Sequence, residues 1–228
     1  MEQKAIFDDF ANEYDSWFDT PVGSKVKELE LDLLLGLVKP QQGLNMLEVG
    51  IGTGLFAMEF RKRGIEIVGI DPSEKMREIA KKRGFDVRYG TGEQIPFPDN
   101  TFDVVFSMTS MEFSQEPDLF VSEMTRVAKP NGTVVVAVLN LWSTYGISRR
   151  VRGIFRRSFF NDAHFYAYGE LKGLLSRHLT GVEVSSSVFI NPSPSEWLLR
   201  RANNLEVFGR RHLKPFGALL AGAGRKVN

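Results

Sequence analysis

Apolar runs bounded by glycine, proline or charged residues recur along the chain and predict buried β-strands. The runs span residues 44–49, 66–70, 86–89, 104–107, 133–139, 182–190 and 216–226. Between them, apolar residues at helical spacing predict amphipathic helices over 5–18, 24–38, 55–63, 117–129 and 194–212. Pro21 and Gly23 are expected to break the first of these helices. Strands that alternate with helices indicate an α/β fold.

A glycine-rich loop follows the first predicted strand and carries Gly50, Gly52 and Gly54. Glycine permits a tight turn, and the absence of a Cβ lets a ligand approach the backbone closely. A strand, a glycine loop and a helix in this order present backbone N–H groups to a nucleotide-like ligand. The simpler interpretation is a glycine-rich turn in an ordinary βαβ unit.

The spacing of these glycines distinguishes between ligands. A dinucleotide site has the pattern G-x-G-x-x-G, but Leu55 stands at its third glycine position. The third glycine is instead Gly54, and the acid Glu48 lies two residues before the loop. This E-x-G-x-G-x-G pattern resembles motif I of the class I S-adenosylmethionine-dependent methyltransferases.

Residues 90–103 carry a second resemblance to the same family. Its small-molecule branch, methyltransferase type 11, includes quinone-biosynthesis enzymes and shows G-D-A-E-x-L-P-F-x-x-x-x-F-D there. The matching residues are Gly90, Glu93, Pro96, Phe97, Phe102 and Asp103. Thr91 and Gly92 replace the family's aspartate and alanine. Because that aspartate accepts from the adenine amino group in the family, adenine recognition here would rest more on the backbone of Gly92 or Glu93; alternatively, Glu93 is an acid at a helix N-terminus.

The resemblance covers most of the chain and implies a Rossmann-like class I methyltransferase fold. It implies a seven-stranded, mostly parallel sheet with helices on both faces, whose last strand is antiparallel and inserted between the fifth and sixth. We therefore expect a single methyltransferase domain over 1–228. Its expected parts are an N-terminal helical cap (1–40), a cofactor-binding half (41–140), a cap insertion (141–167), and C-terminal helices and last strands (168–228).

The resemblance also implies which residues bind S-adenosylmethionine, whose product is S-adenosylhomocysteine. Asp71, at the end of the second predicted strand, can accept both ribose hydroxyls; alternatively, Asp71 or Ser73 caps the next helix. Tyr14 belongs to an A-x-x-Y-D pattern that lies over the cofactor in the family, although aromatic residues at this spacing are usually core. The full expected set is Tyr14, Glu48, Gly50, Gly52, Gly54, Asp71, Pro72, Met76, Gly92, Glu93 and Ser107.

The reaction implied is in-line transfer of the sulfonium methyl group to a nucleophile of a small molecule. Because the sulfonium is already a good leaving group, the protein mainly supplies approximation and alignment. A general base is needed only for a hydroxyl, a protonated amine or an acidic carbon. The candidate bases are His164 in the cap insertion, Glu112 after the fourth strand, and Tyr14; each has an alternative structural interpretation.

A basic segment lies within the expected cap insertion. No acid occurs from 124 to 161, and five arginines crowd nine residues: Arg149, Arg150, Arg152, Arg156 and Arg157. Such a segment fits an acidic substrate, peripheral contact of 149–160 with an anionic membrane, or a solvated helix face. The interleaved aromatic residues favour an apolar or aromatic substrate, and the arginines favour a carboxylate or phosphate on it.

Composition narrows the function classes. The net charge of +1 gives no reason to expect a nucleic-acid partner. The absence of cysteine excludes disulfides and thiolate metal sites, and the sequence has no metal-ligand cluster, so no metal is expected. No apolar run is long enough to span a membrane, and the N-terminus lacks the layout of a signal peptide. We therefore expect a cytoplasmic protein, and the sequence indicates no particular oligomeric state.

Two function classes remain as alternatives to methyl transfer. One is a regulatory protein that binds S-adenosylmethionine without turnover. The other is a nicotinamide-dependent oxidoreductase, against which Leu55 in the glycine loop already counts.

Overall fold

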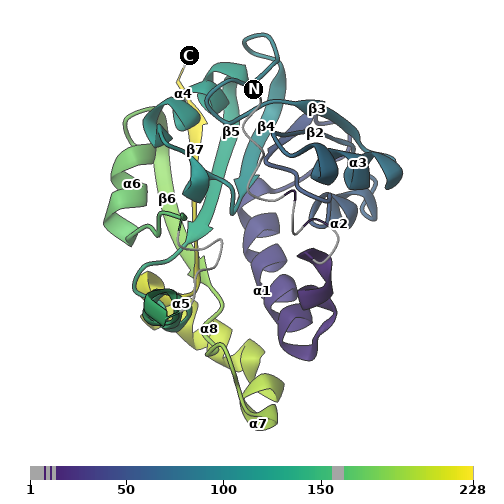
Figure 1. Ribbon diagram of the computed structural model, residues 1–228. Coiled ribbons are helices and arrows are strands. Elements are labelled where there is room, and N and C mark those ends of the chain that lie inside the picture. The colour runs from purple at the N-terminus through teal and green to yellow at the C-terminus, as the bar shows by residue number, and fades with distance from the viewer. Residues whose placement is uncertain (1–7, 9–10, 12–13, 156–161, 228) are drawn as a thin grey trace.

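The strands of the described chain pair in one sheet, in the order β3-β2-β1-β4-β5-β7-β6 (Figure 1). The structure is a computed structural model that describes residues 8, 11, 14–155 and 162–227, with the backbone alone over 150–155. The strands are β1 (Met46–Val49), β2 (Ile67–Asp71), β3 (Asp86–Tyr89), β4 (Phe102–Met108), β5 (Ala128–Leu139), β6 (Leu179–Ser187) and β7 (Leu219–Lys226). They confirm the predicted α/β class.

Helices connect most of these strands. The α-helices are α1 (Pro21–Val38), α2 (Ala57–Arg61), α3 (Glu74–Lys82), α4 (Pro117–Val127), α5 (Thr144–Phe155), α6 (Tyr168–Leu175), α7 (Glu196–Arg200) and α8 (Ala202–His212). Short 3-10 helices are η1 (Tyr14–Asp19), η2 (Met111–Phe113) and η4 (Lys214–Phe216).

Strands β1 to β5 pair with one another in parallel, whereas β7 is antiparallel to both β5 and β6. The β5–β7 register runs from Thr133 opposite Arg225 to Leu139 opposite Leu219. The expected insertion of an antiparallel last strand between the fifth and sixth is confirmed. Because the parallel strands share one direction, the segments that follow β1, β2, β4 and β5 meet at one edge of the sheet, where ligands bind in such folds.

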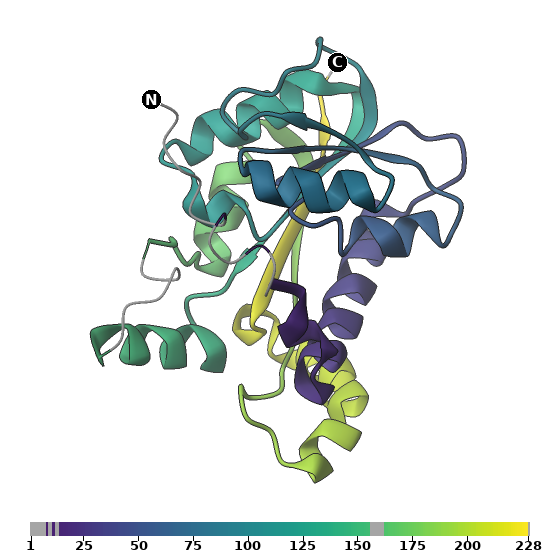
Figure 2. The same cartoon turned by 45° about the vertical axis from the view of Figure 1, so that its right-hand side comes forward.

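Two hydrophobic cores cover the faces of the sheet (Figure 2). Helices α1, α2 and α3 contribute to one core, and α4 and α6 contribute to the other. Successive residues of a strand point to opposite faces, so Val105 and Phe106 of β4 enter different cores. The Phe106 ring stacks on Phe60 of α2, with 5.3 Å between their centroids.

A third, smaller core holds α5 and α8 beside α1. It joins Val26 and Leu29 of α1 with Tyr145 of α5 and Ala202 of α8. Figure 1 shows α5, α7 and α8 at the end of the molecule below the sheet. This core fixes which face of α5 packs against the rest of the protein.

The N-terminal helices differ from the prediction. Most of 5–13 lies outside the described residues, and 14–19 form the 3-10 helix η1 rather than an α-helix. Pro21 and Gly23 begin α1, because proline fits the first helical turn and Thr20 Oγ1 accepts from Gly23 N at 3.0 Å. A Cβ on Gly23 would lie 2.0 Å from Trp17 O, so glycine allows η1 to turn back against α1.

Two further local features refine the prediction. The predicted helix over 194–212 is divided into α7 and α8 at Arg201. The turn before the apolar part of β5 places Asn131 at φ 62°, the positive value expected for its position in a family turn that usually carries glycine.

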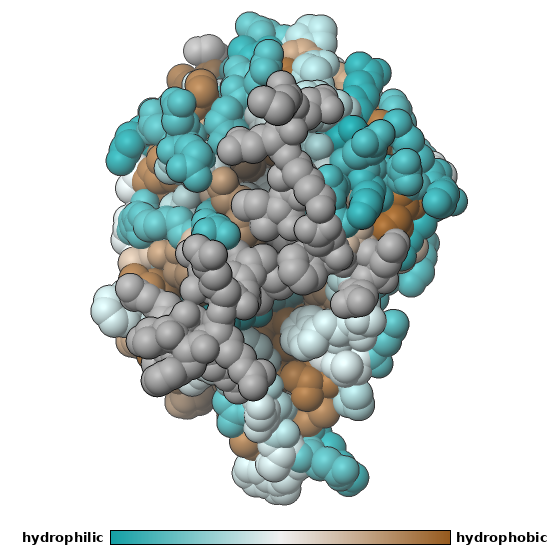
Figure 3. All heavy atoms as spheres, viewed as in Figure 1, coloured by the Kyte–Doolittle hydropathy of each residue, from teal (hydrophilic) through white to brown (hydrophobic). Residues whose placement is uncertain are grey.

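Hydrophilic residues dominate the upper half of the face in Figure 3, and more apolar residues reach the surface in its lower half. Exposed large apolar residues include Trp142 just before α5, Ile147 of α5, and Val207 and Phe208 of α8. In the part of the chain that the structure describes, no helix has the length and apolar character needed to cross a bilayer.

Candidate active site

The glycine loop turns over the end of β2. Gly50 N and Ile51 N both donate to Ile70 O, at 2.9 and 3.0 Å. Gly50, Gly52 and Gly54 all have positive φ, at 76°, 56° and 80°. A Cβ on Gly50 would lie 2.4 Å from the Ser110 Cβ, whereas a Cβ on Gly52 would meet nothing within 4 Å. Gly52 therefore leaves open space at the point where a ligand would approach the backbone.

Glu48 lies one residue before the end of β1, under this loop, and is 2% exposed. Its Oε2 atom is buried without a hydrogen-bond partner among the described residues. Burial, followed by the charge of Asp71, raises the pKa of Glu48 well above its usual range. An unpartnered buried acceptor at this place calls for a donor from a ligand, and the amino group of S-adenosylmethionine supplies one.

Asp71 is held in a fixed orientation by two backbone donors. Gly52 N donates to its Oδ2 and Ser73 N to its Oδ1, both at 2.8 Å. Burial raises the pKa of Asp71 to about 6, against these two hydrogen bonds. The helix cap is Ser73, whose Oγ accepts from Met76 N at 3.2 Å, so Asp71 is not the cap of α3. Each Asp71 oxygen keeps acceptor capacity for a ribose hydroxyl.

The N-terminal segment closes over the loop. The Tyr14 hydroxyl hydrogen-bonds with the Thr109 side chain, and burial raises the pKa of Tyr14. Asp15 accepts from Thr53 Oγ1 at 2.8 Å and is paired with Arg83, directly after α3. Asp8 Oδ1 accepts from Ser73 Oγ at 2.5 Å. These contacts make Tyr14 the roof of the site.

A cavity of about 60 Å³ lies between this roof and the strand ends. It is lined by Tyr14, Glu48, Gly50, Ile51, Gly52, Thr53, Leu55, Phe56, Asp71, Met76, Met108, Thr109 and Ser110. Sites for small ligands usually measure about 300–1,000 Å³. A whole cofactor therefore enters only when the roof moves.

Several residues of this cavity lacked a recognisable pattern in the sequence. Thr109 has φ 49°, which is unusual for a β-branched residue. Such unusual backbone angles are often found at ligand sites. Ser110 Oγ donates to Val49 O at 3.0 Å and lies 2.6 Å from Ser107 Oγ. These contacts fix the loop after β4 against the end of β1.

Five residues expected at the cofactor lie outside the cavity lining. These are Gly54, Pro72, Gly92, Glu93 and Ser107. Ser107 is buried in β4. Glu93 lies in a turn over 91–94, not at a helix N-terminus, and its Oε1 accepts from Ser114 Oγ at 2.5 Å. A Cβ on Gly92 would lie 2.0 Å from the Phe120 ring, which explains why the family's alanine is absent here.

Glu112 lies in η2, beyond the carboxyl end of β4, and is 1% exposed. Its Oε1 accepts from Leu139 N at 2.6 Å, and its Oε2 is buried without a partner among the described residues. Burial raises the pKa of Glu112 to about 7, although two backbone hydrogen bonds and Arg149 act in the opposite direction. This carboxyl can therefore exchange a proton near neutral pH.

His164 is placed outside the cavity lining. Its Nε2 lies 2.7 Å from Glu170 Oε1, and its ring packs edge-on against Tyr166 with centroids 4.5 Å apart. Its backbone N–H donates to Glu112 O at 2.8 Å. The side chain is 56% exposed, so the imidazole points to solvent and Glu170 while the backbone supports Glu112.

Arg149, the described member of the basic segment, faces two acids. Its charge lowers the pKa values of both Glu30 and Glu112, and burial lowers its own pKa. The side chains of the other four arginines lie outside the described residues, and so does any membrane contact of 149–160. The sequence analysis did not identify Glu30 as a site residue. A signal was present, because Glu30 lies four residues from both Val26 and Leu34 on the apolar face of α1.

The residues present fit S-adenosylmethionine. Glu48 would bind its amino group, and Asp71 would bind its ribose. Gly52 would let the cofactor approach the backbone closely, and Met76 would pack against its nucleoside. The bound cofactor supplies an activated methyl group on a positively charged sulfur. Among the described residues, no group of three or more histidines or acids is arranged to hold a metal ion.

Comparisons with known proteins agree with this geometry. Residues 47–136 match the methyltransferase type 11 family, described as a methyltransferase domain. An uncharacterized protein of Methanocaldococcus jannaschii is 32% identical over 170 residues, which are 75% of this chain and 78% of that protein. A demethylmenaquinone methyltransferase of Renibacterium salmoninarum is 32% identical over 66% of this chain and 63% of its own length.

A solved structure is similar over nearly the whole chain. It is an S-adenosylmethionine-dependent methyltransferase of Thermotoga maritima, described as a possible histamine N-methyltransferase. It is 29% identical, covers 97% of this chain and 98% of its own, and has a TM-score of 0.79. Neither a non-catalytic regulator nor a nicotinamide-dependent oxidoreductase is favoured by these similarities. The chain belongs to the class I S-adenosylmethionine-dependent methyltransferases, in the methyltransferase type 11 family.

Proposed function

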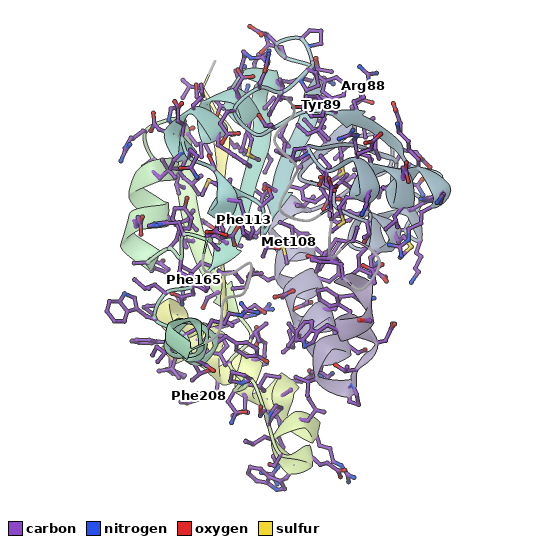
Figure 4. All side chains as sticks on the ribbon, viewed as in Figure 1. Arg88, Tyr89, Met108, Phe113, Phe165 and Phe208 are labelled. Carbon is purple, nitrogen blue, oxygen red and sulfur yellow. The ribbon has the colours of Figure 1, made fainter. Side chains whose placement is uncertain are left out.

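We propose that this enzyme methylates a small apolar or aromatic molecule. The observation that carries the proposal is the set of side chains beside the cofactor cavity, at the ends of β4 and β5. Figure 4 shows Met108 at the end of β4, Phe113 in η2 after the same strand, and Phe165 in the segment between α5 and α6. Met108 lines the cofactor cavity, and Phe165 is 8% exposed. Such surroundings favour an apolar ring over a polymer or a highly polar acceptor.

The names of two relatives support the same class of acceptor. One is named for demethylmenaquinone, which contains a quinone ring, and the other for histamine, which contains an imidazole ring. Both are small molecules with a flat ring. The cap insertion over 141–167, the domain layout over 1–228 and the assigned cofactor residues remain proposals of the same kind.

A labelled-methyl assay with a panel of aromatic alcohols, phenols and amines tests the proposal. We expect transfer to at least one ring-bearing acceptor, and Phe165→Ala should raise its KM about tenfold while leaving S-adenosylhomocysteine affinity unchanged. Phe208→Ala is the matched control, because Phe208 is 56% exposed on α8. Binding of S-adenosylmethionine without transfer to any of these acceptors would contradict the proposed acceptor class.

A further inference from the structure

Glu30, Glu112 and Arg149 form a buried charge cluster between α1, η2 and α5. Glu112 is 1% exposed and Glu30 is 9% exposed. Arg149 acts electrostatically on both carboxyls, and the charge of Glu112 acts on Glu30. Above about pH 8, where Glu30 is ionised as well as Glu112, one guanidinium faces two carboxylates, which leaves one excess negative charge in a region of low dielectric constant.

The other charged groups near the cluster do not remove this excess. Glu206 of α8 also acts on Glu30, but it is paired with Arg210, whose Nε lies 2.8 Å from Glu206 Oε1. The groups that face Glu112 are Arg149, Glu30 and the hydroxyls of Tyr14 and Tyr166. Among the described side chains around Glu112, Arg149 is therefore the cation.

Three buried polar atoms around the cluster lack hydrogen-bond partners within the described part of the chain. They are Glu112 Oε2 and the hydroxyl oxygens of Tyr145 and Tyr166. The Tyr145 hydroxyl is subject to the charges of Arg149 and Glu30, and the Tyr166 hydroxyl to that of Glu112. Buried polar atoms in proteins are nearly always paired, so these atoms indicate a place for a polar ligand group. A carboxylate oxygen can be satisfied only by a donor.

The cluster adjoins the cofactor cavity through Tyr14. This residue lines the cavity, and its hydroxyl is subject to the charges of both Glu30 and Glu112. Figure 4 places Phe113, the neighbour of Glu112, near Met108 of the cavity lining. A group bound at Glu112 would therefore lie beside the bound cofactor, where an acceptor atom must be.

We propose that the acceptor atom is a nitrogen that arrives as a protonated amine, and that Glu112 takes its proton. This rests on the proposed function and names the chemical class of its acceptor. An ammonium group donates to Glu112 Oε2, and its charge pairs with the Glu112 carboxylate. An anionic acceptor, which the arginines of the sequence suggest, could not donate to Glu112 Oε2 and would be repelled by its carboxylate.

The step balances with groups that the site provides. One N–H proton moves to the Glu112 carboxylate, and the freed nitrogen lone pair forms a bond to the methyl carbon while the carbon–sulfur bond breaks and its electron pair stays on sulfur. Glu112 then returns the proton to solvent. The pKa of Glu112, raised to about 7 by burial, suits a base that works near neutral pH.

Calorimetry on protein saturated with S-adenosylhomocysteine tests the inference without turnover. The probes are phenethylamine, phenethyl alcohol and phenylpropionate, which share one ring and differ in charge. We expect the amine to bind at least about tenfold more tightly than the other two, because a hydrogen bond to a charged group is involved. In Glu112→Gln the amine should lose about tenfold in affinity and the alcohol should not.

The glutamine variant keeps an acceptor for Leu139 N, so the end of β5 should remain intact. Glu183→Gln, at an exposed position of the edge strand β6, is the matched control and should change nothing. If Glu112→Gln fails to fold, Tyr166→Phe and Glu30→Gln keep the test open. The first should weaken amine binding modestly, because one hydroxyl acceptor is lost, and the second should weaken it only above about pH 8, where Glu30 is a carboxylate.

A pH profile gives a second readout. With an amine acceptor, kcat/KM should rise as pH increases through about 7, where Glu112 becomes a carboxylate, and Glu112→Gln should lose this rise. Preference for phenylpropionate, equal binding of all three probes, or no amine binding by protein that still binds S-adenosylhomocysteine would overturn the inference. Failure to bind S-adenosylhomocysteine would instead overturn the proposed function itself.

Discussion

Thr53 Oγ1 donates a hydrogen bond of 2.8 Å to Asp15 Oδ1, across 38 positions of the chain. The same carboxylate is paired with Arg83, directly after α3, and Arg83 also donates to Thr53 O at 2.9 Å. Tyr14, the roof of the site, is thus connected to the glycine loop through its neighbour Asp15. Because the cavity under the roof is smaller than a cofactor, exchange of the cofactor requires this contact to open.

Asp15→Ala should therefore speed cofactor exchange. The loss of one hydrogen bond and one partly buried ion pair should raise the dissociation rate of S-adenosylhomocysteine about tenfold. Stopped-flow fluorescence can follow the exchange through Trp17, which lies two residues away in η1. Asp19→Ala, at an exposed position of the same 3-10 helix, is the control. Equal rates in both variants would show that Asp15 does not hold the roof.

Asp71→Asn should weaken binding of S-adenosylhomocysteine about 10–100-fold, because a charged acceptor for two ribose hydroxyls becomes a neutral one. Isothermal titration calorimetry measures the change directly. The wild-type affinity should also fall below about pH 6, where burial leaves the Asp71 carboxyl protonated.

The control for this prediction is Asp86→Asn, an exposed aspartate at the start of β3. Its affinity for S-adenosylhomocysteine should equal that of the wild type at every pH. An Asp71→Asn protein that binds as tightly as the control would leave Asp71 with a structural role alone, through Gly52 N and Ser73 N.

Glu30 should make the enzyme less stable as pH rises. Burial raises its pKa from 4.5 to about 8, so the folded protein binds more protons than the unfolded chain between these values. The free energy of unfolding then falls as pH increases across this window. The drop in melting temperature from pH 6 to pH 8.5 should be smaller in Glu30→Gln, by about 2–4 °C.

Glu28→Gln serves as the control for Glu30, because Glu28 is exposed on the same helix. Differential scanning calorimetry at the two pH values compares the variants. A wild-type protein whose stability is flat or rises between them would contradict a protonated Glu30 in the folded state.

Gly92→Ala should destabilise the protein by about 1–3 kcal/mol, because the added methyl group would lie 2.0 Å from the Phe120 ring. Gly36→Ala should have the opposite sign. Gly36 lies in α1, and a Cβ there would meet nothing within 4 Å, so about 0.5–1 kcal/mol of stability should be gained. Chemical denaturation measures both changes.

The sequence predicted those features that depend on local pattern. Apolar runs predicted the strands, and the glycines at 50, 52 and 54 indicated a tight turn, which the loop forms with positive φ at all three. Asn131 likewise has the left-handed conformation expected of a residue that replaces glycine in a turn. Such features follow from what each residue can adopt by itself, so a single sequence carries them.

Features that depend on distant partners were not accessible in this way. Glu93 lies in a turn over 91–94 and does not begin a helix, which the local pattern did not reveal. Arg149 faces Glu30, a residue more than 100 positions earlier that no local pattern connects with it. The backbone of His164 contacts Glu112, which the sequence did not indicate, and its ring pairs with Glu170. Side-chain direction is set by packing between segments, which periodicity does not describe.

The position of β7 has a consequence for synthesis. This strand is assembled from residues 219–226, yet it fills the gap between β5 and β6, and β6 pairs with no other strand of the described sheet. While the ribosome is still translating the preceding residues, the apolar edge of β5 has no neighbour on one side. Such an edge invites pairing with other chains, so a translational pause before codon 219 should leave a nascent protein that depends on chaperones.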